Sequence, residues 1–346
     1  MLFQVVRSRA HAPFNNTLFT LRQDDWNDFS FQTQYQLYSR AADGSETLIG
    51  DVKILKKGQT SKDGHQLQEG LYQALDESYC SIGQSLDYYE RLAGLELNAR
   101  DAALQGFRDI VKFPDLADDF RNEPGWKISL FRSISEDDDF ISLARTLLTR
   151  DYSELPSIDL EFSFLMTGWN DAVSFSFNAP QINNNWRFKP FTKLAFPPKT
   201  KDLPARISVI IGRNGSGKST LLARLARISH ASRRDRKMKT MTALGQLIPD
   251  GLGFSRIVAI SYSAFDSFQV PGISRDERNQ IAKDMAEGKG RYIFCGLRDI
   301  VQELADELKV VTPAFNPDQE MVSDRIHHTL LKPILTLPPC NASHSA

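Results

Sequence analysis

A glycine-rich run with one lysine constrains this chain more than any other stretch. Gly212, Gly217, Lys218 and Ser219 match the pattern G-x-x-x-x-G-K-[ST] without a mismatch. The aliphatic run 207–211 precedes the loop and has the composition of a buried strand. After the loop, apolar residues recur at helical spacing, at Leu221, Leu222, Leu225, Ala226 and Ile228. The sequence therefore predicts a strand, a loop and a helix in succession.

Such a loop is suited to hold phosphate groups. Residues without a Cβ let the backbone fold closely around an anion, and the helix that follows adds free N–H groups and the positive end of its dipole. Lys218 would reach the β- and γ-phosphates, and the hydroxyl of Ser219 would bind Mg²⁺. The alternative is a surface turn beside a lysine, but strand, loop and helix agree on the first interpretation. The predicted site comprises Gly212, Arg213, Asn214, Gly215, Ser216, Gly217, Lys218, Ser219 and Thr220.

Composition narrows the class of protein. A chain of 346 residues is long enough for about two domains, and it has no apolar run that would span a bilayer. The first residues are too short in apolar content for a signal peptide. Cys80, Cys295 and Cys340 form no C-x-x-C pair, which argues against a zinc site or a disulfide framework and favours a reducing cytoplasm.

Charge is unevenly distributed although the net charge is only -1. Between Arg206 and Arg256 there are eleven Lys and Arg residues against two acidic residues. This zone favours binding of a polyanion, either a nucleoside triphosphate or a nucleic acid. Its densest part, 232–239, would contact phosphates of DNA or RNA, or would be a solvated loop.

Upstream of the loop, alternation predicts β structure over 14–55. Phe31, Thr33, Tyr35 and Leu37 alternate with polar residues, and a second alternating strand over 47–55 follows the turn at Asp43-Gly44. In that second strand the inward residues would be Leu48, Gly50, Val52 and Ile54. From about 69 to 116 apolar residues recur every three or four positions, which predicts helices.

Further elements follow on either side of the loop. The run Ser135 to Asp138 predicts a capped helix start rather than a metal site. Alternation predicts two strands, 158–164 and 173–177, joined by a turn at 168–171. The connection to the phosphate loop holds four aromatic residues that would either stack on a nucleobase or anchor the chain: Trp186, Phe188, Phe191 and Phe196.

After the loop, strands are predicted at 256–263 and 292–295, with helices near 300–308 and 321–331. Polar residues past the carboxyl end of a strand often build sites in α/β sheets. Asp266 or Gln269 could therefore contact Mg²⁺, its water or the γ-phosphate; a capping role is the alternative for Asp266.

The segment from Gly212 to Leu222 resembles the Walker A segment of ABC-type P-loop ATPases. It is similar to the soluble SMC/RecF-like branch and to bacterial AAA-labelled ATPases, some encoded in phage-defence loci. The resemblance at motif level covers about 205–270. It implies an α/β fold with a P-loop NTPase core, ATP and Mg²⁺ as ligands, and ATP held between two subunits in a homodimer or with a partner subunit.

This chain departs from that family pattern. After Thr220 it has no Leu-Ser-Gly-Gly-Gln-like signature, no aliphatic strand ending in Asp-Glu and no switch histidine, and the strand 257–260 ends in Ser261. Only 134 residues follow Gly212. We therefore expect a C-terminally shortened member of the family, and no catalytic residue is assigned.

The expected organisation has three parts: a β-rich and helical region over 1–200, a P-loop core over 201–335 and a disordered tail over 336–346. The N-terminal strands could belong to the same sheet as the core. The expected function is binding of ATP, with hydrolysis in the full-length family, coupled to DNA or to a defence effector. Two alternatives stay open: a regulatory module that binds nucleotide without turnover, and another P-loop kinase or GTPase.

Overall fold

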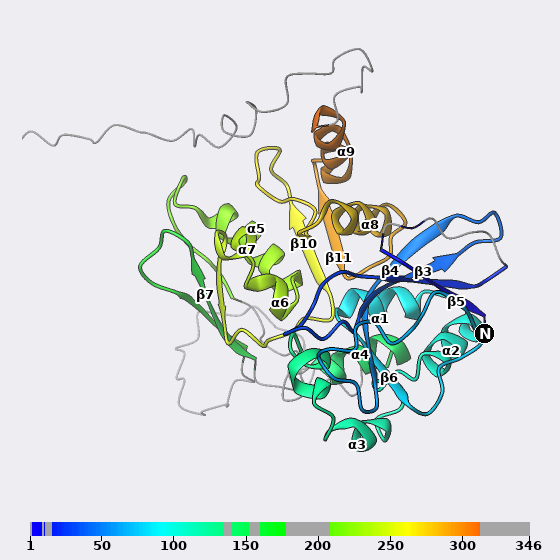
Figure 1. Ribbon diagram of the computed structural model, residues 1–346. Coiled ribbons are helices and arrows are strands. Elements are labelled where there is room, and N and C mark those ends of the chain that lie inside the picture. The colour runs from blue at the N-terminus through cyan, green and yellow to red at the C-terminus, as the bar shows by residue number, and fades with distance from the viewer. Residues whose placement is uncertain are drawn as a thin grey trace, which may run out of the picture. The chain divides into compact units, whose positions relative to one another are not determined.

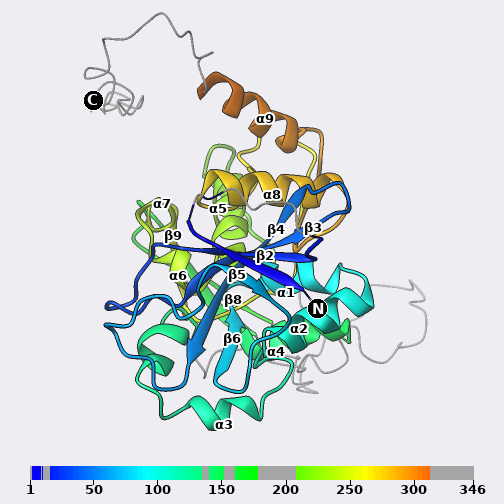
Figure 2. The same cartoon turned by 45° about the vertical axis from the view of Figure 1, so that its right-hand side comes forward.

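The computed structural model describes residues 2–8, 10, 16–134, 140–151, 160–177 and 208–311. By packing, the chain divides into Met1–Leu304 and Ala305–Ala346. The fold is mixed α/β, and the account below concerns the first of these units (Figures 1 and 2).

The N-terminal part is built on a six-stranded sheet with the strand order β5-β1-β2-β3-β4-β6. Its strands are β1 (Phe3–Val6), β2 (Phe19–Gln23), β3 (Gln34–Arg40), β4 (Glu46–Lys56), β5 (Gly70–Tyr72) and β6 (Tyr79–Gly83). Only β1 and β2 run parallel; every other neighbouring pair is antiparallel. The predicted β structure over 14–55 and its hairpin are thus confirmed, with Gly44 at φ 84° in the turn.

The simple alternation predicted for the second strand of that hairpin is wrong. In β4 the register shifts so that Leu37 pairs with Gly50 and Tyr38 with Leu48, which leaves Ile49 as a bulge. From Val52 to Leu55 all four side chains are buried. A strand covered on both faces has no polar face, so its burial pattern cannot alternate.

The helices predicted over 69–116 begin later than expected, because β5 and β6 occupy the first part of that range. All five residues of β6 are buried, so it lacks the alternation that identifies a strand in sequence. Ser85 then caps α1 by accepting a hydrogen bond from Tyr88 N. The helical elements are α1 (Leu86–Ala93), α2 (Leu97–Gly106), α3 (Leu116–Phe120), the π-helical turn η1 (Trp126–Leu130) and α4 (Phe140–Thr149). The acidic run from Ser135 to Asp138 lies outside the described residues.

A second sheet supports the predicted loop. It contains β7 (Glu161–Met166), β8 (Val173–Ser176) and β9 (Gly245–Ile248) in the order β8-β7-β9, all antiparallel. The hairpin of β7 and β8 confirms the two predicted strands. Helix α5 (Lys218–His230) packs on this sheet, and its residues Leu221 and Ile228 join an aromatic core formed by Phe162, Phe164 and Phe175.

The last described part contains two parallel strands, β10 (Ile257–Ser261) and β11 (Tyr292–Gly296), joined through α8 (Arg275–Ala286) (Figure 1). Both strands confirm predictions. Two short helices, α6 (Arg233–Arg236) and α7 (Lys239–Thr242), follow α5, and α9 (Ile300–Val311) follows β11. The helix predicted at 321–331 and the tail predicted at 336–346 lie outside the described residues.

Candidate functional site

The glycine-rich loop leads directly into the first turn of α5. Gly217 is the N-cap residue and has φ 85°, and Gly215 has φ 79°. Both are in the left-handed region, where residues with a Cβ are strained. The two glycines therefore let the chain reverse before Lys218, and the predicted loop-to-helix junction is confirmed.

The side chain of Lys218 closes the loop on itself. Its ammonium donates hydrogen bonds of 2.8 Å to Gly212 O and 2.8 Å to Arg213 O, six and five residues back. A Cβ on Gly212 would lie 2.8 Å from Ser216 Oγ, so a larger residue there would have to displace the Ser216 side chain. The result is a short ring of backbone that holds a positive charge at its centre.

The outer surface of this ring is open to solvent. Arg213, Asn214, Gly215 and Ser216 are exposed, as is Ser219 in the first turn of α5. The first N–H groups of a helix have no partner within the helix, and the helix dipole places partial positive charge there. The arrangement is therefore suited to bind an anion beside a free hydroxyl.

The strand predicted before the loop is not formed. Ile207 lies outside the described residues, and 208–211 have no strand conformation. Ile210 packs partly against the aromatic core, but Val209 is 73% exposed and Ile211 90% exposed. An aliphatic run forms a buried strand only where a neighbouring strand can pair with its backbone. In the described part of the chain, no strand pairs with 208–211.

Sequence analysis missed an aromatic residue beside the loop. Trp169 stands in the turn after β7, and its ring lies 3.4 Å from the position of a Cβ on Gly217. Its side chain is 37% exposed. A large aromatic residue in a tight turn was the available signal. The four aromatics predicted for this role, at 186, 188, 191 and 196, lie outside the described residues.

Asp266 and Gln269 each accept a hydrogen bond from an arginine side chain. Arg298 donates a hydrogen bond of 2.6 Å to Asp266 Oδ1, and the carboxylate also caps Phe268 N at 3.1 Å. Burial opposes ionisation of Asp266, but hydrogen bonds from Ser261 and Arg298 lower its pKa. Gln269 Oε1 accepts from Arg227 of α5 at 2.9 Å. Asp266 thus accepts from a turn N–H and from Arg298, and because 266–270 have no helical conformation it does not cap a helix. Within the described ranges, no group of three or more His, Cys, Asp or Glu side chains could hold a metal ion.

The basic stretch 232–239 is folded rather than a loop, since it forms α6 and the start of α7. Arg236 donates to the carbonyls of four residues, at 2.7 to 3.3 Å: Ile228, Ser229, Asp250 and Leu252. Arg233 pairs with Asp250, and Arg234 lies over the Trp26 ring at 4.4 Å. Lys237 and Lys239 are exposed. Three arginines of the stretch therefore hold the fold together, and the two lysines face solvent.

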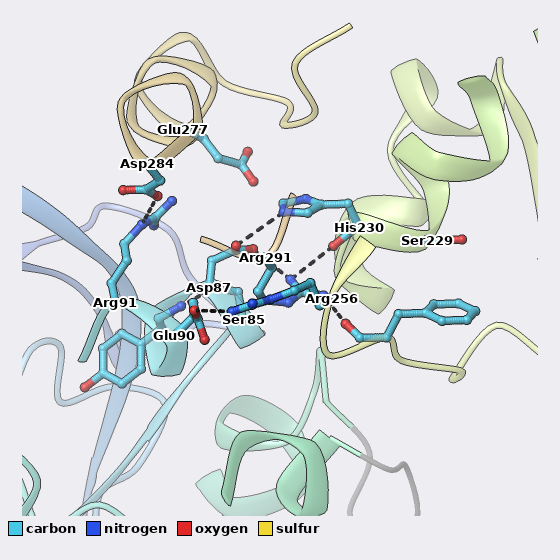
Figure 3. Close-up of polar contacts among 12 residues, drawn as sticks. Ser85, Asp87, Glu90, Arg91, Ser229, His230, Arg256, Glu277, Asp284 and Arg291 are labelled. Atoms are coloured by element: carbon cyan, nitrogen blue, oxygen red, sulfur yellow. Dashed lines mark hydrogen bonds and ion pairs between the residues drawn. The ribbon is translucent and has the colours of Figure 1, made fainter. Parts of the chain in front are cut away.

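A buried ion-pair cluster lies at the opposite end of α5 (Figure 3). Arg291, the residue just before β11, donates hydrogen bonds of 2.8 Å to Asp87 Oδ2 and 2.6 Å to Phe254 O. His230, the last residue of α5, places Nε2 3.3 Å from Asp87 Oδ1. Burial alone would raise the pKa of Asp87, but His230 and Arg291 hold it well below its usual value. The cluster joins α1 of the N-terminal part to the helix that carries the loop.

Further ion pairs extend this junction along α1. Arg91 contacts Asp284 of α8 at 2.8 Å, and Glu90 accepts from Arg256 at 3.2 Å and from Arg150 at 2.6 Å. Figure 3 shows Arg91 directed toward Asp284 and Arg256 toward Glu90. Helix α1 is therefore tied by charge to α8 and to the residue just before β10.

Comparison with known proteins gives one relative. Over 304 residues the chain is 29% identical to protein ea59 of Escherichia phage lambda. The alignment covers 86% of this chain and 52% of that protein, so the chain spans about half the length of this relative. No protein-family profile matches the chain, and no solved structure matches it. Among the helices in the described ranges, none combines the length and the apolar character needed to cross a membrane.

Proposed function

We propose that this chain binds ATP with Mg²⁺ at the loop Gly212–Thr220. The observation that carries the proposal is the loop closed by Lys218 at the N-terminus of α5, with Gly215 and Gly217 in the left-handed region. A ring of backbone, a positive charge at its centre and a helix N-terminus together form a receptor for a chain of phosphates. The fold expected on this proposal is a P-loop NTPase core of ABC type.

Each group has a distinct part in this binding. Backbone N–H groups at the start of α5 donate to phosphate oxygens, and Lys218 exchanges its two carbonyl acceptors for oxygens of the β- and γ-phosphates. The exposed hydroxyl of Ser219 is a ligand for Mg²⁺, which bridges phosphate oxygens and neutralises their charge. The ring of Trp169 beside Gly217 offers an apolar face to the nucleobase.

Binding without turnover is the second candidate function. The sequence suggested Asp266 as a carboxylate that could contact Mg²⁺ or its water. Arg298 pairs with this carboxylate, and the Asp266 side chain is 1% exposed. A buried carboxylate whose Oδ1 is held by an arginine orients water less readily than a free one. The chain would then act as a nucleotide-dependent regulatory module, working as a homodimer or with a partner subunit in the cytoplasm. Light scattering with and without ATP and Mg²⁺ tests the dimer.

The proposal is tested by equilibrium binding of a fluorescent ATP analogue in the presence of Mg²⁺. Replacing Lys218 by Ala removes a charged donor worth about 1.5 to 3 kcal/mol, so affinity should fall about 10- to 150-fold. Lys239→Ala, an exposed lysine outside the loop, is the matched control. The proposal fails if the wild-type chain does not bind ATP, or if Lys218→Ala binds as tightly as wild type.

Two further measurements separate the alternatives. Phosphate release under saturating ATP distinguishes an ATPase from a module that only binds. Competition by GTP distinguishes an adenine site from the GTPase alternative, because an adenine site should be displaced by GTP only weakly.

A further inference from the structure

A cavity of about 310 Å³ is lined by residues of β3, β4, α1, α6 and α8. Its volume is at the lower end of the range for small-molecule sites, which is about 300 to 1,000 Å³. Two basic side chains line it, Arg91 and Arg234. The acidic side chains that line it are Asp24, Asp51, Asp87, Asp235, Asp276 and Glu277. We call this space the acidic cavity.

Only part of this negative charge is balanced within the protein. Asp87 pairs with Arg291, and Arg91 pairs with Asp284 of α8. Four of the remaining carboxylates form no ion pair with any Lys or Arg of the described residues: Asp24, Asp51, Asp235 and Glu277. The acidic cavity therefore carries excess negative charge.

Two of these four carboxylates share one neutral donor. Gln34 Nε2 lies 3.2 Å from Asp24 Oδ2 and 3.2 Å from Asp51 Oδ2. Arg234 donates to Gln34 Oε1 at 3.1 Å instead of pairing with either carboxylate. Burial and the charge of Asp24 raise the pKa of Asp51 to about 6. Like charges that share a site disfavour ionisation, so a cation between them would favour the charged forms.

The other two carboxylates come from α6 and α8. Asp235 Oδ2 accepts from Ser232 Oγ at 2.7 Å, and Glu277 Oε2 accepts from Ile273 N at 2.8 Å. Burial raises the pKa of both groups, and the charge of Asp235 adds to the effect on Glu277. These donors are neutral, so they leave the charge of both carboxylates in place.

A buried acceptor in the same cavity lacks a partner. Gln84 is 6% exposed and lines the acidic cavity. Its Nε2 donates to Ile82 O at 3.2 Å, which fixes the orientation of the amide because a carbonyl cannot donate. Within the described residues, Gln84 Oε1 accepts no hydrogen bond. Buried polar atoms nearly always have a partner, so Oε1 points to a donor that a ligand supplies. Gln84 also borders a cavity of about 50 Å³, which has room for water alone.

We propose that the acidic cavity binds a small organic cation that carries amino or guanidino groups. The N–H groups of the ligand donate to Asp51, to Glu277 and to Gln84 Oε1. Within the described residues no group of three or more carboxylates is close enough to hold a metal ion, so the spacing suits a larger cation with several donors. Because β4, α6 and α8 all line the cavity, the ligand joins the N-terminal sheet to the part that carries the phosphate loop.

The test titrates agmatine, which carries one guanidinium and one ammonium group, into the full chain without ATP. Isothermal titration calorimetry at neutral pH should show one saturable site. Asp51→Asn and Glu277→Gln should each weaken binding about tenfold or more, because a charged acceptor becomes neutral. Gln84→Met keeps the length of the side chain without the acceptor and should weaken binding about 2- to 12-fold. Asp119→Asn, at the surface, is the control and should bind as the wild type does.

Two measurements separate binding from an effect on folding. Asp51→Asn removes a buried carboxylate that ionises with difficulty, so without ligand its unfolding temperature should be no lower than that of the wild type. Agmatine should raise the unfolding temperature of the wild type more than that of this variant. Agmatine should also bind about tenfold more weakly at about pH 5 than at neutral pH, because Asp51 takes up a proton below a pKa of about 6.

Four results would overturn the proposal. The first is that neither agmatine nor putrescine binds at a saturable site. The second is that NaCl or MgCl₂ at equal ionic strength reproduces the effect, which would be screening alone. The third is that an arginine-containing peptide binds and agmatine does not, which would assign the cavity to a protein partner. The fourth is an affinity that Asp51→Asn or Gln84→Met leaves unchanged.

The phosphate loop is tested separately from the acidic cavity. Lys218→Ala should lose ATP and bind agmatine as the wild type does, whereas Asp51→Asn should lose agmatine and keep ATP. Loss of agmatine in Lys218→Ala would place the cation at the phosphate loop and would also overturn the proposal.

Discussion

Asp87 and Arg291 lie 204 positions apart in sequence and form a buried ion pair of 2.8 Å between Asp87 Oδ2 and Arg291 Nη1. Arg291 also donates to three backbone carbonyls, of His230, Phe254 and Ser255. One guanidinium therefore joins the first turn of α1, the end of α5 and the segment before β10. Arg291 therefore makes charged hydrogen bonds both to the N-terminal part and to the part that carries the loop.

We predict that Asp87→Asn lowers the free energy of unfolding by about 3 to 5 kcal/mol, because it leaves the Arg291 guanidinium buried without its counterion. Urea denaturation at neutral pH measures the change. Asp119→Asn is the control, since Asp119 pairs with Lys57 at the surface and such pairs contribute about 1 kcal/mol or less. Equal effects of the two substitutions would show that the cluster carries no special stability.

A second prediction concerns pH and Asp109, which is fully buried and accepts hydrogen bonds from Tyr89 Oη and Val111 N. Burial raises its pKa to about 7 from an ordinary value of 3.8. Between these values the folded chain holds one proton more than the unfolded chain, so the free energy of unfolding falls as pH rises toward 7. The loss is about 1.4 kcal/mol for each pKa unit.

Asp109→Asn removes this titration; the amide oxygen can still accept from Val111 N, while the amide NH2 donates to Tyr89 Oη instead of accepting from it. We expect the free energy of unfolding of the variant to change less between about pH 4 and pH 7 than that of the wild type. Urea denaturation across that range measures both slopes. Parallel pH profiles would show that Asp109 ionises normally in the folded chain.

A third prediction separates backbone strain from loss of the site at Gly217. Alanine at φ 85° costs about 1 to 2 kcal/mol, and its Cβ would meet Trp169 at 3.4 Å. Gly168→Ala is a matched control, because Gly168 has φ 92° and open space around it. Both variants should lose similar thermal stability, and only Gly217→Ala should lose ATP binding. Loss of ATP binding in both would mean that strain in either loop is sufficient.

A fourth prediction divides the basic stretch by function. Arg236→Ala should lower the free energy of unfolding by about 2 kcal/mol or more, since four carbonyls lose a charged donor. Lys237→Glu with Lys239→Glu should change stability by about 0.5 kcal/mol or less, because both lysines are exposed. If the stretch contacts DNA, the lysine variant should bind duplex DNA more weakly and with a smaller salt slope in fluorescence anisotropy. Unchanged DNA binding would leave the two lysines as solvated surface residues.

Local sequence patterns correctly predicted the elements that bury only one face. The strands β7 and β8 alternate because one face meets the aromatic core, and α5 begins where glycine gives way to helix-forming residues. β6 was predicted as helix because its five residues are buried without alternation. Periodicity reports how many faces an element buries, so it fails where both faces are covered.

The candidate site divides in the same way. The loop is local, so its glycines and Lys218 were identified from sequence. Trp169 was assigned only to a turn, because its position beside Gly217 depends on how the β7–β8 hairpin packs against α5. The roles of Arg291 and Arg298 depend on partners brought together by the fold, and no local pattern specifies them.

The separation between Asp87 and Arg291 also sets an order of events during synthesis. A ribosome that adds 5 to 20 residues per second needs about 10 to 40 s to pass from residue 87 to residue 291. During that interval Asp87 and Arg91 have emerged before their partners Arg291 and Asp284 have been made. Until then these charges of the nascent N-terminal part stay hydrated, and the ion pairs that join α1 to Arg291 and to α8 form late in synthesis.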